Sequence, residues 1–392
     1  MKVSHEYFFG PDHQVELGDL LDATLITHER LNSPACDLPA IYEQLEQSIS
    51  YTDRQVPRLL IKDSKGSSET DVVLLQTPYA NRVMPVGSAR DVNAYIAGDV
   101  SLANKINSNS WNMAIKHYFL HEVIKTASVH DTEGKTLPIM VIPSPSGDHK
   151  RKYNGTCNAN IRDGNFSPYA LDSLDAVRDA GYNRIHLIGY SLGAMVARSI
   201  VEKASFKNID VSNVTLAEPA LIGGLLKTVK AYTNIGERQP SPEPIASTDE
   251  QKIGTWTDGS PKLITNLDAT PAGWINNITS APKNNLDLLI GLAKPEKFKD
   301  FIKSDIGKQP GKTNGLMPVT LAYSAFSRMS VGFEELISES PALATLKKLR
   351  LLQVLRADGH IAIKDQHGFG EHHPYYADMM ARGIIFATKN PT

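Results

Sequence analysis

A serine between two glycines is the residue of this chain whose type and setting best suit covalent chemistry. Ser191 is the centre of the pentapeptide 189–193 (GYSLG), which follows the apolar run 185–188 and precedes a segment with small apolar residues at helical spacing. This order predicts a strand, a sharp turn and a helix with the serine at the apex, a nucleophile elbow. The glycines two positions before and two positions after Ser191 let the strand and the helix approach closely. The N–H groups at the start of the helix can stabilise an oxyanion, so the pattern predicts attack of the serine on a carbonyl carbon.

The segment 185–204 resembles the elbow of the α/β-hydrolase superfamily. The resemblance implies an α/β fold, with a mainly parallel sheet flanked by helices and an inserted helical cap. It also implies an oxyanion loop upstream of the serine and an acid and a histidine downstream, in that order. No cofactor is implied.

The C-terminal segment supplies the candidates for the general base. Glu371-His372-His373-Pro374 precedes the last predicted helix and resembles the family's G-H-x-P-x-x-E/D pattern, with Glu371 in place of the usual glycine. Matching residue by residue assigns His372 as the base and Asp378 as the trailing acid. Histidine suits this role because its ordinary pKa is about 6.5. Alternative bases in the same segment are His373, His360 and His367.

The acid that orients the base is expected directly after a strand. Asp358 follows the apolar run 350–356, which we interpret as the strand after the cap, and its surroundings resemble the family's acid loop. Asp358 and His372 are only 14 positions apart, so the strand that the family usually has between them is expected to be short or missing. Asp365 is an alternative acid. Glu218 is another, because some family members carry the acid after the sixth strand.

The loop after the strand 71–77 is the expected source of the second oxyanion donor. It begins Pro78-Tyr79, and we assign the N–H of Tyr79 together with the N–H of Leu192. The loop lacks the glycine-rich form of this element, and an ordinary strand-ending turn is the alternative, since proline and asparagine are common in turns.

Apolar runs of strand length alternate with segments at helical spacing along the first 220 residues. The predicted strands are 56–63, 71–77, 137–143, 185–188, 211–217 and, near the C-terminus, 350–356. The predicted helices are 38–49, 111–123, one opening at Ser167-Pro168, one after Ser191 and one before the C-terminus, and 144–166 is expected to be a loop. This alternation is typical of a mainly parallel sheet covered on both faces.

The region between the strand 211–217 and residue 348 shows no clear strand alternation. We interpret 286–292, 298–302, 317–329 and 333–346 as helices. The predicted division is an N-terminal extension (1–50), a first part of the hydrolase core (51–220), a cap or lid placed by resemblance (221–315) and a second part of the core (316–392). Trp256, Trp274 and Phe298 could line an acyl pocket, although packing within the cap is the commoner use of such residues.

The composition excludes several classes of protein. The 392 residues carry a net charge of -2, so neither nucleic acid nor an anionic membrane is an expected partner. Cys36 and Cys157 are too few for a disulfide framework, and free thiols are expected. The N-terminus does not resemble a secretory signal and no run reaches 18 apolar residues, so we expect a cytoplasmic protein without a membrane span. The oligomeric state stays open.

Two functions remain. The first is a serine hydrolase that cleaves an ester or related acyl bond of a small molecule, with Ser191, Asp358 and His372 as the triad and Leu192 and Tyr79 as the oxyanion hole. The alternative is a catalytically inactive binding or structural protein that keeps the fold. No metal is expected, because the histidines near 367–373 lack a ligand pattern, and no glycine-rich phosphate loop suggests a nucleotide-binding dehydrogenase.

Overall fold

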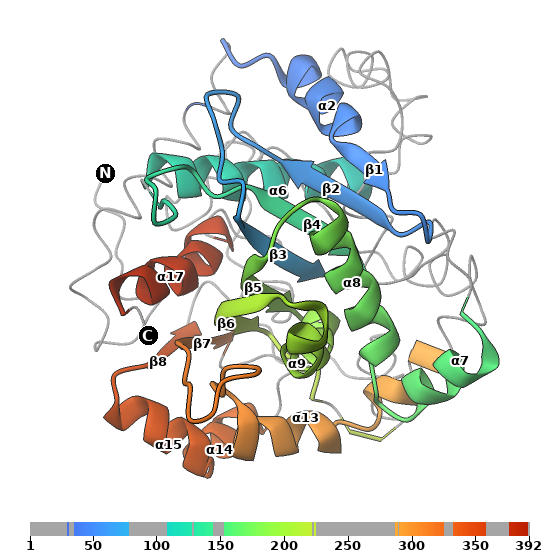
Figure 1. The fold of residues 1–392 in the computed structure, drawn as a ribbon, viewed down its shortest axis with the longest axis vertical. Coiled ribbons are helices and arrows are strands. Elements are labelled where there is room, and N and C mark those ends of the chain that lie inside the picture. The colour runs from blue at the N-terminus through green and yellow to red at the C-terminus, as the bar shows by residue number, and fades with distance from the viewer. Residues whose placement is uncertain are drawn as a thin grey trace, which may run out of the picture.

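The computed structural model describes residues 30, 35–77, 108–127, 129–143, 153–221, 223–224, 287–288, 290–324, 332–357 and 376–390. Their strands form an eight-stranded sheet in the order β1-β2-β4-β3-β5-β6-β7-β8 (Figure 1). The strands are β1 (Ile49–Tyr51), β2 (Pro57–Ile61), β3 (Asp71–Thr77), β4 (Ile139–Pro143), β5 (Arg184–Tyr190), β6 (Asp210–Ala217), β7 (Val319–Ser324) and β8 (Leu352–Ala357). Strand β2 is antiparallel to both its neighbours, and from β4 to β8 every pair is parallel.

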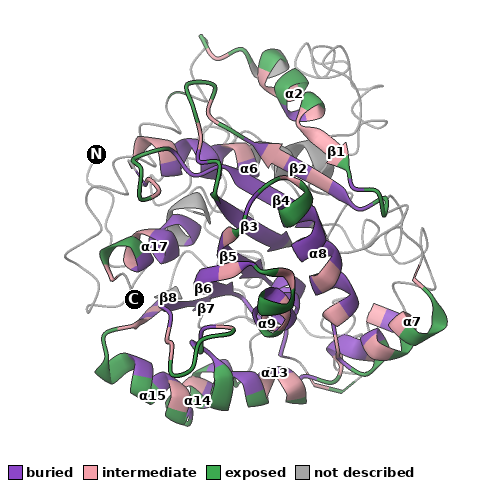
Figure 2. Ribbon diagram, viewed as in Figure 1, coloured by how far each residue is buried: buried purple, intermediate pink, exposed green. Residues whose placement is uncertain are grey.

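The central strands are buried along almost their whole length because both faces of the sheet are covered. In β5 every residue after Arg184 is buried, and in β6 every residue after Asp210 is buried (Figure 2). Parallel strands in such a position read as continuous rather than alternating apolar runs. The apolar run of β5 therefore follows from its place in the middle of the sheet, whereas β6 also buries the polar residues Ser212, Asn213 and Thr215.

Two sets of helices cover the two faces. On one face lie α8 (Ser167–Asp179), α9 (Leu192–Lys203) and the chain that contains α13 (Glu296–Asp300), η5 (Phe301–Asp305), α14 (Phe333–Ser338) and α15 (Pro341–Lys348). On the other lie α2 (Leu38–Gln47), α6 (Ser108–Thr126) and α17 (Tyr376–Lys389). The remaining short elements are α7 (Gly155–Arg162) and η3 (Ala204–Lys207). Figure 1 shows α8 and α9 on the opposite side of the sheet from α6 and α17. Among the described residues, no helix combines the length and the apolar character that a bilayer crossing would need.

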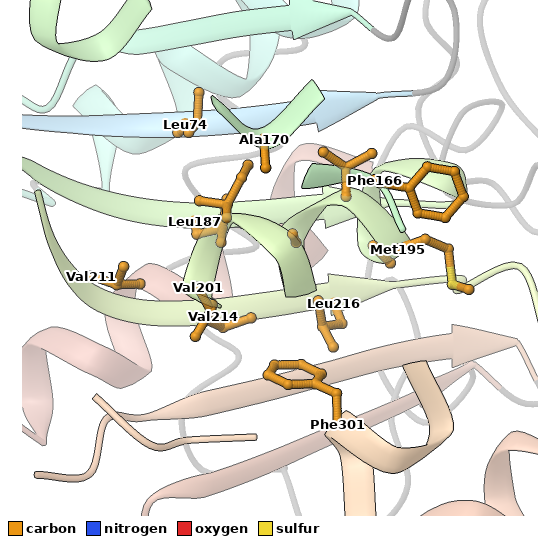
Figure 3. Close-up of a cluster of buried hydrophobic side chains, with 14 of the residues drawn as sticks. Leu74, Phe166, Ala170, Leu187, Met195, Val201, Val211, Val214, Leu216 and Phe301 are labelled. Atoms are coloured by element: carbon orange, nitrogen blue, oxygen red, sulfur yellow. The ribbon is translucent and has the colours of Figure 1, made fainter. Parts of the chain in front are cut away.

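The larger core cluster joins the sheet to α8, α9 and η5 (Figure 3). Leu74, Leu187 and Leu216 come from three neighbouring strands, and Met195 of α9 and Phe301 of η5 pack on them. All five side chains are at most 2% exposed. This burial fixes the position of α9, whose first turn follows Ser191, relative to the strands.

The predicted α/β class with a mainly parallel sheet is confirmed, and each of the six predicted strands overlaps a strand of the structure. The predicted helix over 317–329 is wrong, because 319–324 form β7 between β6 and β8. This run is apolar and buried on both faces, and strand pairing rather than local spacing decides its state. The predicted loop over 144–166 also contains α7, which Asn154 caps by accepting a hydrogen bond from the N–H of Cys157 at 2.9 Å.

The cap boundaries stay a prediction, since most of 221–315 lies outside the described residues. The longest described part, 290–315, contributes Leu292, Phe298 and Phe301 to the core cluster that also contains the strands. Gly224 donates from its N–H to the carbonyl of Ala293 at 2.8 Å, so the chain leaving β6 and the chain returning toward β7 lie side by side. Trp256 and Trp274 lie outside the described residues.

Candidate active site

Ser191 occupies the turn between β5 and α9 in a strained backbone conformation. Its φ is 56° and its ψ is -119°, in a region that residues with a side chain rarely adopt. The N–H of Ser191 donates to the carbonyl of Ala217 at 2.8 Å, and its own carbonyl accepts from the N–H of Ala194 at 3.1 Å. These bonds hold the turn between β6 and the first turn of α9. The predicted strand, sharp turn and helix around Ser191 are confirmed.

The two glycines of the elbow are required by close backbone contacts. A Cβ on Gly193 would lie 2.5 Å from the carbonyl carbon of Gln76 in β3, and nearer still to its oxygen. A Cβ on Gly189 would lie 2.7 Å from the carbonyl oxygen of Gly193 and 2.8 Å from the Cβ of Ala197. The first turn of α9 is therefore pressed against β3 and β5 with no room for a methyl group. This is the close approach that the spacing of the pentapeptide predicts.

Leu192 is the first residue of α9 and is 1% exposed. Its N–H is one of the first four of the helix, which have no carbonyl acceptor within the helix, and it lies at the positive end of the helix dipole. An oxyanion formed on a substrate bound to Ser191 would meet this end of α9. The position therefore fits the predicted oxyanion donor.

Glu218 is a buried carboxylate beside the serine. Tyr190 and Ala217 are register partners in β5 and β6, so Ser191 and Glu218 come next on neighbouring strands, which run about 4.8 Å apart. Glu218 is 0% exposed, has a positive φ of 48°, and donates from its N–H to the carbonyl of Ala322 at 2.8 Å. A carboxylate is expensive to bury unless it is paired or hydrogen-bonded. The structure thus brings this alternative acid next to Ser191.

The other predicted site residues lie outside the described residues, and the structure gives only the elements that flank them. These residues are Tyr79, Asp358, His360, Asp365, His367, His372 and His373. Strand β3 ends two residues before Tyr79, and β8 ends immediately before Asp358. Because β3, β5, β6 and β8 all run parallel, their carboxyl ends lie at the edge of the sheet that carries Ser191. Asp378 lies in the first turn of α17.

In the part of the chain that the structure describes, the strand before Asp358 is the last strand, and β7 precedes it. The sequence interpretation treated 350–356 as the strand after the cap, but β7 precedes it and β8 leads directly into the histidine-bearing segment. The short or missing strand expected between Asp358 and His372 stays a prediction, because residues 358–375 lie outside the described residues. Residues 325–331, which follow β7, contain no aspartate or glutamate. The carboxylates directly following strands at this edge are Glu218 after β6 and Asp358 after β8.

Four features together define the architecture: the strand order, the antiparallel second strand, the elbow after β5, and a helix after the last strand that packs on the face opposite α9. The chain has the α/β-hydrolase fold. The resemblance identified from the elbow is confirmed at the level of the fold.

Comparisons with known proteins add no function to this fold. No family model and no curated protein matches the chain. Among solved structures, an esterase from Exiguobacterium antarcticum is similar at 8% identity over 87% of this chain and 99% of that one, with a TM-score of 0.43. An esterase from Pyrobaculum calidifontis is similar at 14% identity over 94% and 99%, with a TM-score of 0.43, and MenH from S. aureus at 11% over 85% and 99%, with a TM-score of 0.42. At these values, the α/β-hydrolase assignment rests on the chain's own strand order and elbow.

Metal and thiol chemistry find little support in the part of the chain that the structure describes. There, no group of three or more histidine, cysteine, aspartate or glutamate side chains is placed to hold a metal ion. Cys36 and Cys157 are free, as predicted, and both are only partly buried. Burial, followed by the nearby Asp37 carboxylate, raises the pKa of the Cys36 thiol above its ordinary value, which lowers its reactivity.

Gln76 is a residue of this site that the sequence interpretation passed over. It is 1% exposed, and its Nε2 donates to Ser173 Oγ of α8 at 2.8 Å. The available signal was a long amide side chain within the otherwise apolar strand DVVLLQT, two residues before the proposed oxyanion loop.

Proposed function

We propose that this protein is a serine hydrolase that cleaves an ester or related acyl bond through an acyl-enzyme on Ser191. The observation that carries the proposal is the strained backbone of Ser191 at the start of α9, held by two glycine contacts too close for any side chain. Strained backbone of this kind is found at functional sites, where the surrounding structure must compensate for its cost. A serine in an ordinary loop would need none of it.

The proposed reaction has two steps. Ser191 Oγ attacks the carbonyl carbon while His372 takes the hydroxyl proton, and the N–H groups of Leu192 and Tyr79 stabilise the oxyanion. His372 then gives the proton to the leaving alcohol, and the acyl group stays on Ser191. In the second step a water molecule, deprotonated by His372, attacks the acyl-enzyme, and the carboxylic acid product leaves as Ser191 regains its proton.

Asp358 is the proposed acid of the triad, and Glu218 is its competitor on a specific observation: full burial beside Ser191. The acid holds the histidine tautomer and stabilises the imidazolium, so its replacement by the amide should lower kcat by about 10⁴-fold. We expect this loss in Asp358→Asn and a much smaller one in Glu218→Gln. A larger loss of kcat in Glu218→Gln than in Asp358→Asn would instead assign the role of the acid to Glu218.

The alternative function is a binding or structural protein without turnover, and the burial of Ser191 favours it. Ser191 is 1% exposed, and an inactive protein has no need to admit a substrate to its hydroxyl. The proposed substrate is a small-molecule ester and the proposed location is cytoplasmic, which cell fractionation would test.

A fluorophosphonate probe and p-nitrophenyl esters with short acyl chains separate the two functions. The proposal expects stoichiometric labelling of the wild type, a burst of p-nitrophenol, and neither of these in Ser191→Ala. Ser199→Ala is the matched control, because Ser199 is a buried serine of the same helix and is 0% exposed. Equal labelling of Ser191→Ala and the wild type, or no labelling of a folded wild type, would contradict the proposal.

A further inference from the structure

The side chain of Gln76 connects the end of β3 to helix α8 through two hydrogen bonds in series. Its Nε2 donates to Ser173 Oγ at 2.8 Å, and Ser173 Oγ donates to the carbonyl of Tyr169, one turn earlier in α8, at 2.9 Å. Gln76 and Ser173 are each 1% exposed, and Tyr169 is 4% exposed. Buried hydrogen bonds of this kind are directional, so they fix an orientation as well as a distance.

The backbone of Gln76 contacts the other helix, α9. Gln76 is the register partner of Gly189 in β5, and its carbonyl group lies against Gly193, where no Cβ could fit. One residue therefore contacts α8 with its side chain and the first turn of α9 with its peptide group. Leu192, the predicted oxyanion donor, directly precedes Gly193 in that turn.

We propose that Gln76 is a positioning residue for the Ser191 site. In this proposal its hydrogen bond to Ser173 fixes the position of the end of β3 relative to the first turn of α9. This inference rests on the proposed function, because it assigns Gln76 to the placement of the Leu192 N–H against Ser191. Donors of an oxyanion hole must be placed to within about 0.5 Å, and a misplacement of about 1 Å can lower the rate about 100-fold. An apolar side chain at position 76 would fill the same space without fixing the register of β3 against α8.

The chain provides a matched control for a purely structural role. Gln353 of β8 is a second buried strand glutamine, 8% exposed, whose Oε1 accepts a hydrogen bond from Thr320 Oγ1 at 3.2 Å. The pair lies two and three strands from β5, on the face of the sheet opposite Gln76. Replacing either residue of this pair removes a comparable buried hydrogen bond at a place that does not contact the turn at Ser191.

The experiment compares Gln76→Met and Ser173→Ala with Gln353→Met and Thr320→Val. Methionine keeps the length of glutamine and removes its amide. We expect Gln76→Met and Ser173→Ala each to lower kcat on a p-nitrophenyl ester by about 10-fold to 100-fold, with KM within about threefold of the wild type. Both should slow fluorophosphonate labelling by a similar factor while leaving its final stoichiometry unchanged. Gln353→Met and Thr320→Val should stay within about twofold in kcat at a similar loss of Tm.

The double variant Gln76→Met/Ser173→Ala adds a readout that stability alone does not move. If Gln76 and Ser173 act through the same hydrogen bond, their effects are not additive, and kcat of the double variant should be no lower than that of the slower single variant. Should Gln76→Met fail to fold, Ser173→Ala carries the same test. The inference is overturned if folded variants of Gln76 and Ser173 keep kcat within twofold, or if the Gln353 and Thr320 variants lose as much. A wild type that is not labelled at Ser191 would instead remove the proposed function, and the inference with it.

Discussion

Gly193→Ala tests the mechanical basis of the elbow with a single methyl group. The new Cβ would lie 2.5 Å from the carbonyl carbon of Gln76, where ordinary contact begins at about 3.4 Å. The atoms in the way belong to the backbone of a central strand, so no side chain can rotate aside. The first turn of α9 and the end of β3 must therefore separate by roughly 1 Å.

This separation is expected to lower both the free energy of unfolding and kcat. Overpacking of a well-packed core costs about 1–3 kcal/mol, so the free energy of unfolding should fall by that amount. A shift of about 1 Å in the turn that carries Ser191 and the Leu192 N–H should lower kcat about 100-fold, because both groups must meet the same carbonyl. The loss in kcat should exceed any change in KM, since substrate binding does not depend on the oxyanion contact.

The assay is urea unfolding together with p-nitrophenyl ester kinetics. Gly155→Ala is the matched control, because Gly155 opens α7 and a Cβ there meets no atom within 4 Å. We expect that control to be at least as stable as the wild type and fully active. A Gly193→Ala protein with the stability and kcat of the wild type would refute the argument that glycine is required there by contact.

Two further predictions concern buried charges away from the elbow. Burial alone would raise the pKa of the Asp71 carboxyl, but hydrogen bonding by His186 and Thr70 and the charges of His186 and Arg184 hold that pKa below its usual 3.8. A lowered folded-state pKa means that the stabilisation is complete above about pH 4 and is lost as the pH falls through the folded value, so Asp71→Asn should flatten the acid side of a plot of unfolding free energy against pH. Arg162→Gln should cost about 1–3 kcal/mol in urea unfolding, since it leaves Asp287, which is 1% exposed, without its guanidinium partner. Lys297→Gln, which removes a partner of the exposed Asp163, should change little, and equal losses in the two variants would contradict this reasoning.

The amino-acid sequence by itself determined the elbow. The spacing of Gly189, Ser191 and Gly193 between an apolar run and a small-residue helix is a local pattern, and local sterics decide its outcome. The helix that begins at Ser167-Pro168 was also predicted from a local signal, the preference of proline for the first turn. The prediction that Ser167 caps this helix is wrong, because Phe166 is the N-cap and makes no side-chain capping hydrogen bond. The α/β class followed from repeating such local signals along the chain.

Only the tertiary structure decided which apolar run becomes a strand in the second half of the chain and which polar residues meet the serine. Residues 319–324 are as compatible with a helix as with a strand, and pairing with β6 and β8 selects the strand. That pairing makes 352–357 the last strand in the described residues, and Asp358 follows it directly in sequence. Glu218 lies beside Ser191, and Gln76 joins α8 to β3, because the strand order brings together residues that are 27 and 97 positions apart in sequence. Contacts over such separations depend on the order and register of the strands across the whole sheet.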